Sequence, residues 1–306
     1  MVDRTAMEYR QLGTDGPEVP AIGLGAWPLG GGMGEMDEQT AIDLVRFAID
    51  EGVTLIDTAQ AYYLSEERVG RALKDGYRDR CFLATKVSTD YSPQAIRKAI
   101  EESLRKLDVD YVDLYQIHSW NAQYPIELSI EAMAELQEEG KTRFIGVSNF
   151  NAEQMRRARK VTTFNSNQPG YNLFNRKIEV ADIPYCEEQG IGILAHSPLA
   201  KGLLSGHYRP GHKFPEDDER SERFQGETFA AQIAIADRLG EVARDKGINM
   251  VQLAIAWILR QDAVTCVLVG AKTPEQIRDH LGAIAVELTE EDLTRIEAIL
   301  GEAPKG

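Results

Sequence analysis

The chain contains 306 residues, of which 43% are hydrophobic and 27% are charged, so it can build a large core and is not a disordered segment. Its formal net charge of −15 disfavours nucleic acid and anionic membranes as partners. Its apolar runs are far shorter than the roughly 20 residues of a transmembrane helix. The first residues show no apolar stretch typical of a secretory signal, so we expect a cytoplasmic protein.

The three cysteines, Cys81, Cys186 and Cys266, are widely spaced and form no CxxC pair. An odd number at such spacing predicts neither a disulfide framework nor a zinc ribbon. We expect buried thiols in a reducing compartment.

Short β-rich runs alternate with longer helical patterns along nearly the whole chain. A hairpin is predicted over residues 8–22, around Asp15-Gly16. The predicted strands that follow are 22–27, 54–57, 81–86, 111–118, 142–148, 164–168, 191–196 and 264–270. The predicted helices are 37–52, 65–76, 92–108, 126–141, 151–160, 179–190, 228–247, 249–261 and 273–283.

The predicted helices carry cap residues where they should begin and end. Residues suited to N-terminal caps are Asp37, Ser92, Asn151 and Thr273. Glycines suited to C-terminal stops are Gly52, Gly140, Gly190 and Gly247.

Eight strand–helix units in a row predict parallel strands closed into a (β/α)₈ TIM barrel, in one domain over residues 1–306, with an N-terminal hairpin and extra C-terminal helices. The alternative is a doubly wound open sheet, which usually has a glycine fingerprint after its first strand. Here Pro28 stands where the third glycine of that fingerprint would be, after Gly23 and Gly25. Residues 30–34 are interpreted as a flexible glycine-rich loop over the barrel mouth, and the polar insert 206–227 as a candidate lid.

Four ionisable side chains are expected at the C-terminal end of this barrel. Asp57 ends the second strand and Tyr62 follows on its loop, Lys86 ends the third strand, and His118 ends the fourth. Singly, each has an ordinary interpretation as a cap, loop aromatic, solvated charge or rim residue. Together, at the face where barrel enzymes work, they indicate an active site.

The four groups suit the reduction of a carbonyl. A carbonyl that accepts a hydride becomes an alkoxide and needs a proton, which Tyr62 can donate. The ordinary pKa of tyrosine is about 10, and we expect Lys86 to lower it. Asp57 would hold Lys86, and His118 would orient the substrate oxygen.

Several segments resemble the aldo-keto reductase family. They are GVTLIDTAQAYYLSEERVG (52–70), ATK (84–86), YQIH (115–118), GKTRFIGVSNF (140–150), NQPGYNLFNR (167–176), SPLAKGLLSG (197–206) and VGAKTPEQI (269–277). The match covers nearly the whole chain in order. It implies a (β/α)₈ barrel that uses NADPH to reduce a small-molecule aldehyde or ketone. NADH is a possible but weaker cofactor. The match also implies an Asp-Tyr-Lys-His tetrad made of Asp57, Tyr62, Lys86 and His118.

The resemblance also implies cofactor residues along the barrel mouth. Ser148, Asn149 and Gln168 correspond to the groups that hold the nicotinamide carboxamide, and the segment 197–204 resembles the pyrophosphate loop. Lys272, before a helix, suits the adenosine 2′-phosphate. The full set is Trp27, Ser148, Asn149, Gln168, His196, Ser197, Leu199, Lys201, Gly202, Leu204, Gly270, Lys272, Gln276 and His280.

The chain departs from the family pattern at two of these positions. His196 stands where the family usually has an aromatic residue that stacks on the nicotinamide, and an imidazole is smaller and can ionise. Lys272 stands where many members have Arg or a Lys-Ser pair, and a lysine lacks the bidentate fork of arginine. The pH dependence of cofactor binding and the preference for NADPH are therefore properties to test.

Aromatic residues on the mouth loops, Trp27, Tyr63, Trp120 and Tyr124, are candidates for the substrate pocket. No particular substrate and no oligomeric state follow from the sequence. One alternative function is a regulatory subunit that binds the cofactor with little turnover. Another is a lyase that forms a Schiff base through Lys86. A metal hydrolase is disfavoured, because the five histidines form no HxH or HExxH pair, and no metal is predicted.

Overall fold

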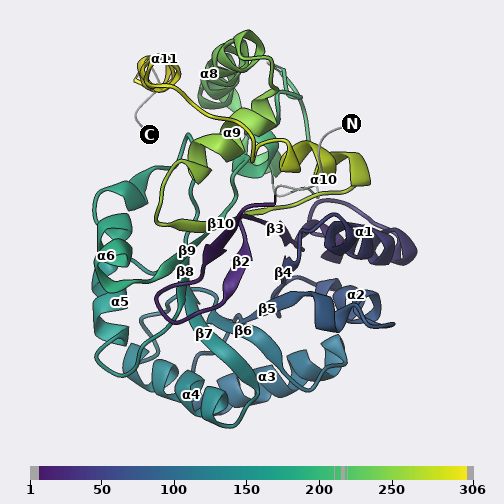
Figure 1. Cartoon of the computed structure of the whole chain (residues 1–306), viewed down its shortest axis with the longest axis vertical. Helices are drawn as coiled ribbons and strands as arrows, with labels where there is room; N and C mark the ends of the chain where they lie inside the picture. The colour runs from purple at the N-terminus through teal and green to yellow at the C-terminus, as the bar shows by residue number, and fades with distance from the viewer. Residues whose placement is uncertain (1–6, 210, 215–217, 219, 302–306) are drawn as a thin grey trace.

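The computed structural model describes residues 7–209, 211–214, 218 and 220–301. Within this part of the chain, eight parallel strands close into a barrel in the order β10-β3-β4-β5-β6-β7-β8-β9 (Figure 1). Their bounds are β3 Ile22–Gly25, β4 Leu55–Asp57, β5 Phe82–Val87, β6 Val112–Ile117, β7 Thr142–Ser148, β8 Ser166–Gln168, β9 Gly192–His196 and β10 Val264–Val269. The eight predicted strands and the barrel are confirmed.

The predicted hairpin closes the N-terminal end of the barrel. Strands β1 (Tyr9–Gln11) and β2 (Glu18–Pro20) pair antiparallel and lie across the end that faces the viewer in Figure 1. Leu12 and Val19 pack into the apolar cluster inside the barrel, with residues such as Leu114 and Leu194. Because this end is filled with apolar side chains, the polar groups inside the barrel gather at the opposite end.

Helices surround the barrel and cover the outer faces of its strands (Figure 1). The α-helices are α1 Glu38–Asp50, α2 Ser65–Ala72, α3 Pro93–Leu107, α4 Ile126–Glu138, α5 Ala152–Ala158, α6 Asp182–Gln189, α7 Arg220–Arg223, α8 Gly226–Asp245, α9 Met250–Leu259, α10 Pro274–Leu281 and α11 Glu290–Leu300. The 3₁₀ turns are η1 Pro28–Gly30, η2 Arg78–Arg80, η3 Lys177–Glu179 and η4 Ala200–Ser205. The main core lies between the helices and the strands.

The predicted caps lie at the helix ends. Asp37 accepts hydrogen bonds from the backbone of Gln39 and Thr40, and Asn151 forms a reciprocal capping box with Gln154. Ser92 and Thr273 also cap α3 and α10. The stop glycines Gly52, Gly140, Gly190 and Gly247 all have positive φ.

The helix predicted over 179–190 is interrupted in the structure. The chain first forms η3 and then starts α6 at Asp182, because Ala181 has a φ of −139° and breaks the helix between them. The C-terminal part adds α11, for which no bounds were predicted; Thr289 begins it with a capping box to Asp292. The insert 206–227 contains α7, and residues 210, 215–217 and 219 of this predicted lid lie outside the described residues.

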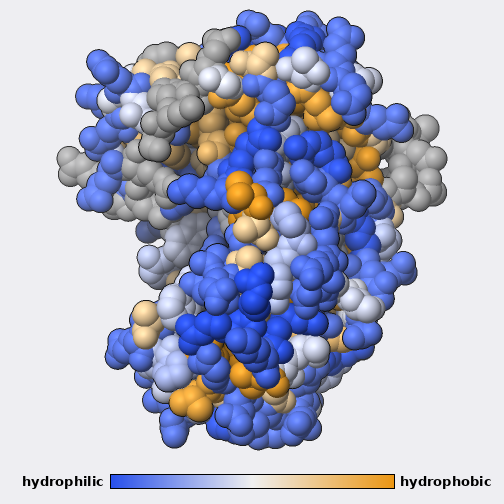
Figure 2. Space-filling model, turned by 90° about the vertical axis from the view of Figure 1, so that its left-hand side faces the viewer, coloured by the Kyte–Doolittle hydropathy of each residue, from blue (hydrophilic) through white to orange (hydrophobic). Residues whose placement is uncertain are grey.

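The face drawn in Figure 2 is mainly hydrophilic and carries separate hydrophobic patches. The C-terminal end of the barrel lies at the left edge of that view, where the molecule is hollowed at about mid-height. Across the described part of the chain, no helix combines the length and the apolar character needed to cross a membrane.

Candidate active site

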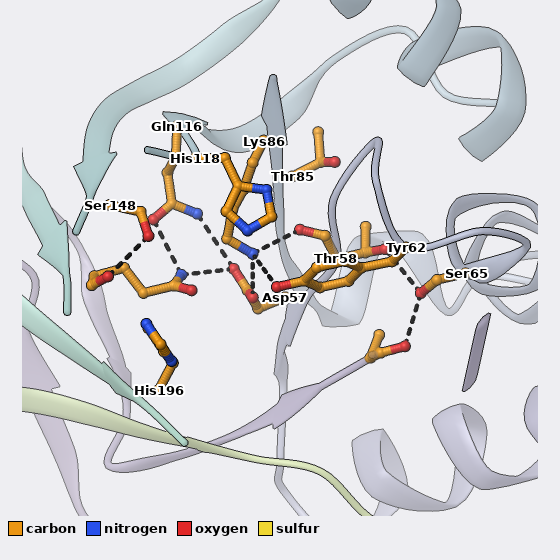
Figure 3. Close-up of polar contacts among 12 residues, drawn as sticks. Asp57, Thr58, Tyr62, Ser65, Thr85, Lys86, Gln116, His118, Ser148 and His196 are labelled. Atoms are coloured by element: carbon orange, nitrogen blue, oxygen red, sulfur yellow. Dashed lines mark hydrogen bonds and ion pairs between the residues drawn. The ribbon is translucent and has the colours of Figure 1, made fainter. Parts of the chain in front are cut away.

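Four polar side chains from adjacent segments meet at the C-terminal end of the barrel (Figure 3). Asp57 is the last residue of β4, Lys86 lies at the end of β5, and His118 directly follows β6. Tyr62 comes from the loop after β4, so all four lie where the C-terminal ends of parallel strands share one edge. The structure therefore brings together the four residues that the sequence singles out.

The ammonium group of Lys86 is buried and bound on all sides. Its Nζ donates to Asp57 Oδ2 at 2.6 Å, to the backbone oxygen of Thr58 at 2.9 Å and to Tyr62 Oη at 3.4 Å. An ammonium has three donors, so three acceptors satisfy it. Burial disfavours the charge, but Asp57 and Tyr62 outweigh burial and raise the pKa of Lys86 above its ordinary value. Lys86 is therefore a cation at neutral pH.

The loop that carries Tyr62 is held by buried hydroxyl groups. Thr58 Oγ1 donates to Ser65 Oγ at 2.8 Å, and Ser65 Oγ donates to the backbone oxygen of Ala26 at 2.9 Å (Figure 3). Gly30 packs so closely on the backbone of Tyr62 that a Cβ at this position would collide with it. At Gly30 the glycine-rich loop is thus a tightly packed segment, which explains the glycine at this position.

Aromatic rings surround the phenol of Tyr62. The ring of Trp27 meets it edge-on at 5.1 Å between centroids, and the ring of His118 does so at 5.5 Å. Burial raises the pKa of Tyr62 above 10.0, and Lys86 lowers it by less than burial raises it. Lys86 thus lowers this pKa as expected, but burial, which the sequence did not predict, leaves the pKa of Tyr62 above its ordinary value. The hydroxyl remains protonated at neutral pH, and its oxygen accepts from Lys86, so its own proton is free to point elsewhere.

His118 is held as a neutral ring. Its Nδ1 lies 2.9 Å from Ser88 Oγ, which also accepts from the backbone N–H of Ala61 at 3.2 Å. Burial, Lys86 and His196 lower the pKa of His118 to about 3. The Ser88 hydroxyl has two acceptors within reach, Nδ1 of His118 and the backbone oxygen of Lys86 at 3.5 Å. When it donates to Nδ1, the proton of the neutral ring lies on Nε2 and can be donated to a ligand.

Two buried glutamines bind the other oxygen of Asp57. Gln168 Nε2 donates to Asp57 Oδ1 at 2.9 Å, and Gln116 Nε2 donates to the same atom at 3.2 Å. Gln168 Nε2 also donates to Gln116 Oε1 at 3.1 Å, and Ser148 Oγ donates to the backbone oxygen of Gln168 at 2.8 Å. Gln116 was missed in the sequence, although it precedes His118 by two positions and a strand directs alternate side chains to one face.

Asn149 links His118 to His196. Its Nδ2 donates to the backbone oxygen of His118 and to Ser148 Oγ, both at 3.0 Å, and its Oδ1 lies 2.9 Å from His196 Nε2. Because Oδ1 can only accept, Nε2 of His196 carries the proton, and Nδ1 accepts from Ser197 Oγ at 2.9 Å. Burial, Lys86 and Lys201 lower the pKa of His196 to about 4, so this ring is neutral at physiological pH.

The segment after β9 turns sharply through left-handed residues. Ser197, Ala200, Lys201 and Gly202 have φ values of 57°, 47°, 57° and 93°. A run of such residues points successive backbone N–H groups to one side, which suits an anion. Of the other predicted cofactor residues here, Leu199 is partly buried and the side chain of Leu204 is fully buried. The backbone N–H groups of Gly202 and Leu204 both donate to the Leu199 oxygen, at 2.9 and 3.1 Å.

The predicted 2′-phosphate residues lie at the start of α10. Lys272 Nζ donates to the backbone oxygen of Met33 in the glycine-rich loop, and the Lys272 backbone N–H donates to Gln276 Oε1 at 2.7 Å. Burial and Arg220 lower the pKa of Lys272, while Asp218 raises it. The insert that carries Arg220 thus lies near Lys272, which the sequence did not predict. Gly270 packs against Pro28 beside this group.

Gln276 and His280 lie one turn apart on α10 but differ in exposure. Gln276 is exposed, whereas the side chain of His280 is buried beside a small cavity that Gly23, Val53 and Val269 also line. Burial lowers the pKa of His280 to about 4. Its contact with an adenine stays a prediction.

The four predicted pocket aromatics fall into two groups. The rings of Trp27 and Tyr63 lie 5.6 Å apart, and Tyr63 is 67% exposed next to Tyr62. Trp120 packs against the core with Arg157 over its ring, and Tyr124 meets Tyr91 edge-on. The first group has contacts with Tyr62; the role of the second stays a prediction.

A closed barrel with a buried lysine, a tyrosine hydroxyl and a neutral histidine at its C-terminal end is the arrangement of a barrel enzyme suited to acid–base chemistry. Residues 21–301 match the model of the Aldo/keto reductase family. Aldo-keto reductase YhdN from Bacillus subtilis is 40% identical, covering 96% of this chain and 94% of that protein. Probable aldo-keto reductase 1 from Glycine max is 33% identical, covering 97% and 90%.

A solved structure agrees with these matches. The glycerol dehydrogenase AKR11B4 from Gluconobacter oxydans has a TM-score of 0.89 and 35% identity, covering 97% of this chain and 96% of that one. The chain belongs to the aldo/keto reductase family, whose members are oxidoreductases of small-molecule carbonyl compounds.

Proposed function

We propose that this protein reduces an aldehyde or ketone to an alcohol with NADPH, and that Tyr62 donates the proton. One observation carries the proposal: the Lys86 ammonium is fully buried and joins Asp57, the backbone of Thr58 and Tyr62 Oη. A fixed positive charge therefore lies against the hydroxyl that must lose a proton.

Bound NADPH would supply a hydride to the carbonyl carbon. The carbonyl oxygen gains the electron pair of the broken π bond, and Tyr62 transfers its proton to that oxygen. An alkoxide is a stronger base than a phenolate, so the transfer is favourable even though burial raises the pKa of Tyr62. Lys86 then stabilises the phenolate that remains. The products are an alcohol, oxidised cofactor and a tyrosinate that takes a proton back from solvent.

His118 would orient the substrate. In the tautomer in which Ser88 donates to Nδ1 and the ring proton lies on Nε2, the neutral ring would donate a hydrogen bond to the carbonyl oxygen and would not compete with Tyr62 as an acid. Trp27 and Tyr63, beside Tyr62, would contact an apolar or ring portion of the substrate. Trp120 and Tyr124 would belong to the outer part of the pocket.

The donor and acceptor groups near the tetrad fit a nicotinamide. The hydroxyl and amides of Ser148, Asn149 and Gln168 are uncharged and suit a neutral carboxamide. His196 would present a flat neutral ring to the nicotinamide, because its pKa is about 4. The contribution of this ring to binding therefore stays constant across physiological pH.

The anionic parts of the cofactor fit the two lysine segments. The turn formed by Ser197, Leu199, Lys201, Gly202 and Leu204 would lie around the pyrophosphate and bring the Lys201 charge to it, while the N–H groups of Gly202 and Leu204 hold the turn by donating to the Leu199 oxygen. Gly270, Lys272 and Gln276, at the start of α10, would receive the 2′-phosphate. In a chain with a net charge of −15, these local cations are where a polyanionic cofactor can bind.

The state of Lys86 argues against a Schiff-base lyase. A nucleophilic lysine must be neutral, whereas Asp57 and Tyr62 raise the pKa of Lys86. Together with the backbone oxygen of Thr58 they accept all three of its donors. Borohydride trapping with carbonyl compounds should leave Lys86 unmodified.

The direct test follows NADPH oxidation at 340 nm with a panel of aldehydes and ketones, and NADH in parallel. The Gluconobacter oxydans relative is a glycerol dehydrogenase, so the panel includes glycerol with NADP⁺ and small polyol-derived aldehydes. Turnover with NADPH supports the proposal. Tight NADPH binding without turnover on any substrate would favour a regulatory subunit that binds cofactor.

A further inference from the structure

Gln116 is a buried polar residue to which the chemistry above gives no role. It lies on β6, its side chain is fully buried, and it contacts Asp57 and Gln168 but none of the proposed reacting groups. A buried amide is costly unless its hydrogen bonds are made, so its partners are informative.

Asp57 and Gln116 together determine how the amide of Gln168 is turned. The Asp57 carboxylate only accepts hydrogen bonds, so both glutamines must turn their amide nitrogens to Oδ1. Gln116 Oε1 is then available to the second N–H of Gln168, at 3.1 Å. Both N–H groups of Gln168 are used, and its Oε1 is turned away from Asp57.

A glycine on the intervening strand makes this contact possible. Gly146 on β7 pairs with Gln116 on one side and with Ser166 of β8 on the other. A Cβ on Gly146 would lie 3.3 Å from Gln116 Cγ and would collide with the Ser166 hydroxyl. Because Gly146 has no side chain, Gln116 can reach across β7 to Gln168 (Figure 3 shows the Gln116 contacts).

We propose that Gln116 is a positioning residue that locks the amide of Gln168 so that Gln168 Oε1 accepts from the amide nitrogen of the nicotinamide carboxamide. This inference rests on the proposed function, because it assumes a nicotinamide cofactor at Gln168. Without Gln116, the Gln168 amide loses one of its two hydrogen bonds and only Asp57 Oδ1 still holds its nitrogen, so less opposes the orientation that presents an N–H to the carboxamide N–H.

The test measures Kd by isothermal titration for NADP⁺ and for 3-acetylpyridine adenine dinucleotide phosphate, in which a methyl replaces the amide nitrogen. Gln116→Met keeps the length of the side chain and removes its hydrogen bonds. We expect this variant to lower the affinity for NADP⁺ by roughly five- to tenfold, the effect of one neutral hydrogen bond. The Kd of the analogue should change by less than about twofold, because the analogue has no amide nitrogen that could donate to Gln168.

A second variant and a control cover the case in which Gln116→Met does not fold. In Gln116→Glu, the protonated carboxyl group has a donor for Asp57 and an acceptor for Gln168, whereas the ionised carboxylate repels Asp57. This variant should therefore bind NADP⁺ with near wild-type affinity at low pH and progressively more weakly as pH rises. Gln137→Met, at a partly exposed position near the end of α4, should leave both Kd values unchanged.

Equal weakening of both cofactors by Gln116→Met would overturn the inference and leave Gln116 a packing residue. So would a Gln116→Glu variant whose affinity ratio to wild type does not change with pH. If the wild-type protein binds neither cofactor, the proposed function itself fails, which is a distinct result.

Discussion

Removing both partners of the Lys86–Asp57 pair should destabilise the protein by less than the sum of the two single removals. The two side chains are 0% and 3% exposed and lie 2.6 Å apart, so a single change leaves an unpaired charge in the barrel. Breaking a buried ion pair from one side typically costs about 3–5 kcal/mol. We expect that cost for Lys86→Met, reduced somewhat because Gln116 and Gln168 still bind Asp57. Asp57→Asn should cost a similar amount, because it leaves the buried ammonium with neutral acceptors only.

The double variant Lys86→Met/Asp57→Asn contains no buried charge at this point. We expect its free energy of unfolding to exceed the value from summing the two single effects by at least about 2 kcal/mol. The assay is urea unfolding at pH 7, followed by far-UV circular dichroism, on the wild type and all three variants. NADPH-dependent turnover should be lost in all three, so that stability recovers in the double variant and activity does not. Single costs that add within about 0.5 kcal/mol would show that the two charges are not coupled and refute the assignment of Lys86 as a cation.

Three further changes test separate parts of the site. Tyr62→Phe should abolish reduction and leave NADPH affinity nearly unchanged in fluorescence titrations; wild-type turnover would exclude Tyr62 as the acid. Lys272→Ala should weaken NADPH more than NADH, by about 1–3 kcal/mol for a lost charged hydrogen bond, and equal losses would place the 2′-phosphate elsewhere. His280 has a pKa of about 4 in the folded protein and 6.5 when unfolded, so the unfolded chain takes up a proton first and stability falls as pH drops below 6.5. Between pH 7 and pH 5, His280→Gln should lose about 2 kcal/mol less stability than the wild type in urea unfolding; an identical loss would show that His280 does not titrate this way.

The barrel and the positions of the four site residues could be predicted because their signals are local. The strands that carry Asp57 and Lys86 are short, mainly apolar runs with the polar residue at or near their ends, and caps such as Asp37 and Asn151 mark where helices begin. Once the strands are parallel and closed, Asp57 and Lys86 must end at the same edge. Local patterns were weaker where a single residue interrupts a helix, as Ala181 does before α6.

The contacts across the barrel could not be predicted in the same way. Gln116 and Gln168 are 52 positions apart, and their hydrogen bond depends on the register of β6, β7 and β8 and on the missing side chain of Gly146. The proximity of Arg220 to Lys272 depends likewise on how the insert folds back. Sequence spacing contains no direct information on either contact.

The pKa of Tyr62 shows that a correct set of residues does not by itself give the net direction of a shift. The sequence places a cation near the phenol, which predicts a lowered pKa, but it does not reveal the burial by Trp27 and the surrounding rings that raises this pKa. The same burial keeps His118 and His196 neutral, with pKa values of about 3 and 4. At neutral pH Lys86 is thus cationic while both imidazoles and the phenol are uncharged. Lys86 therefore helps the phenol to release its proton, because loss of that proton creates an anion that the ammonium stabilises. A proton on either imidazole would instead add a second cation beside Lys86.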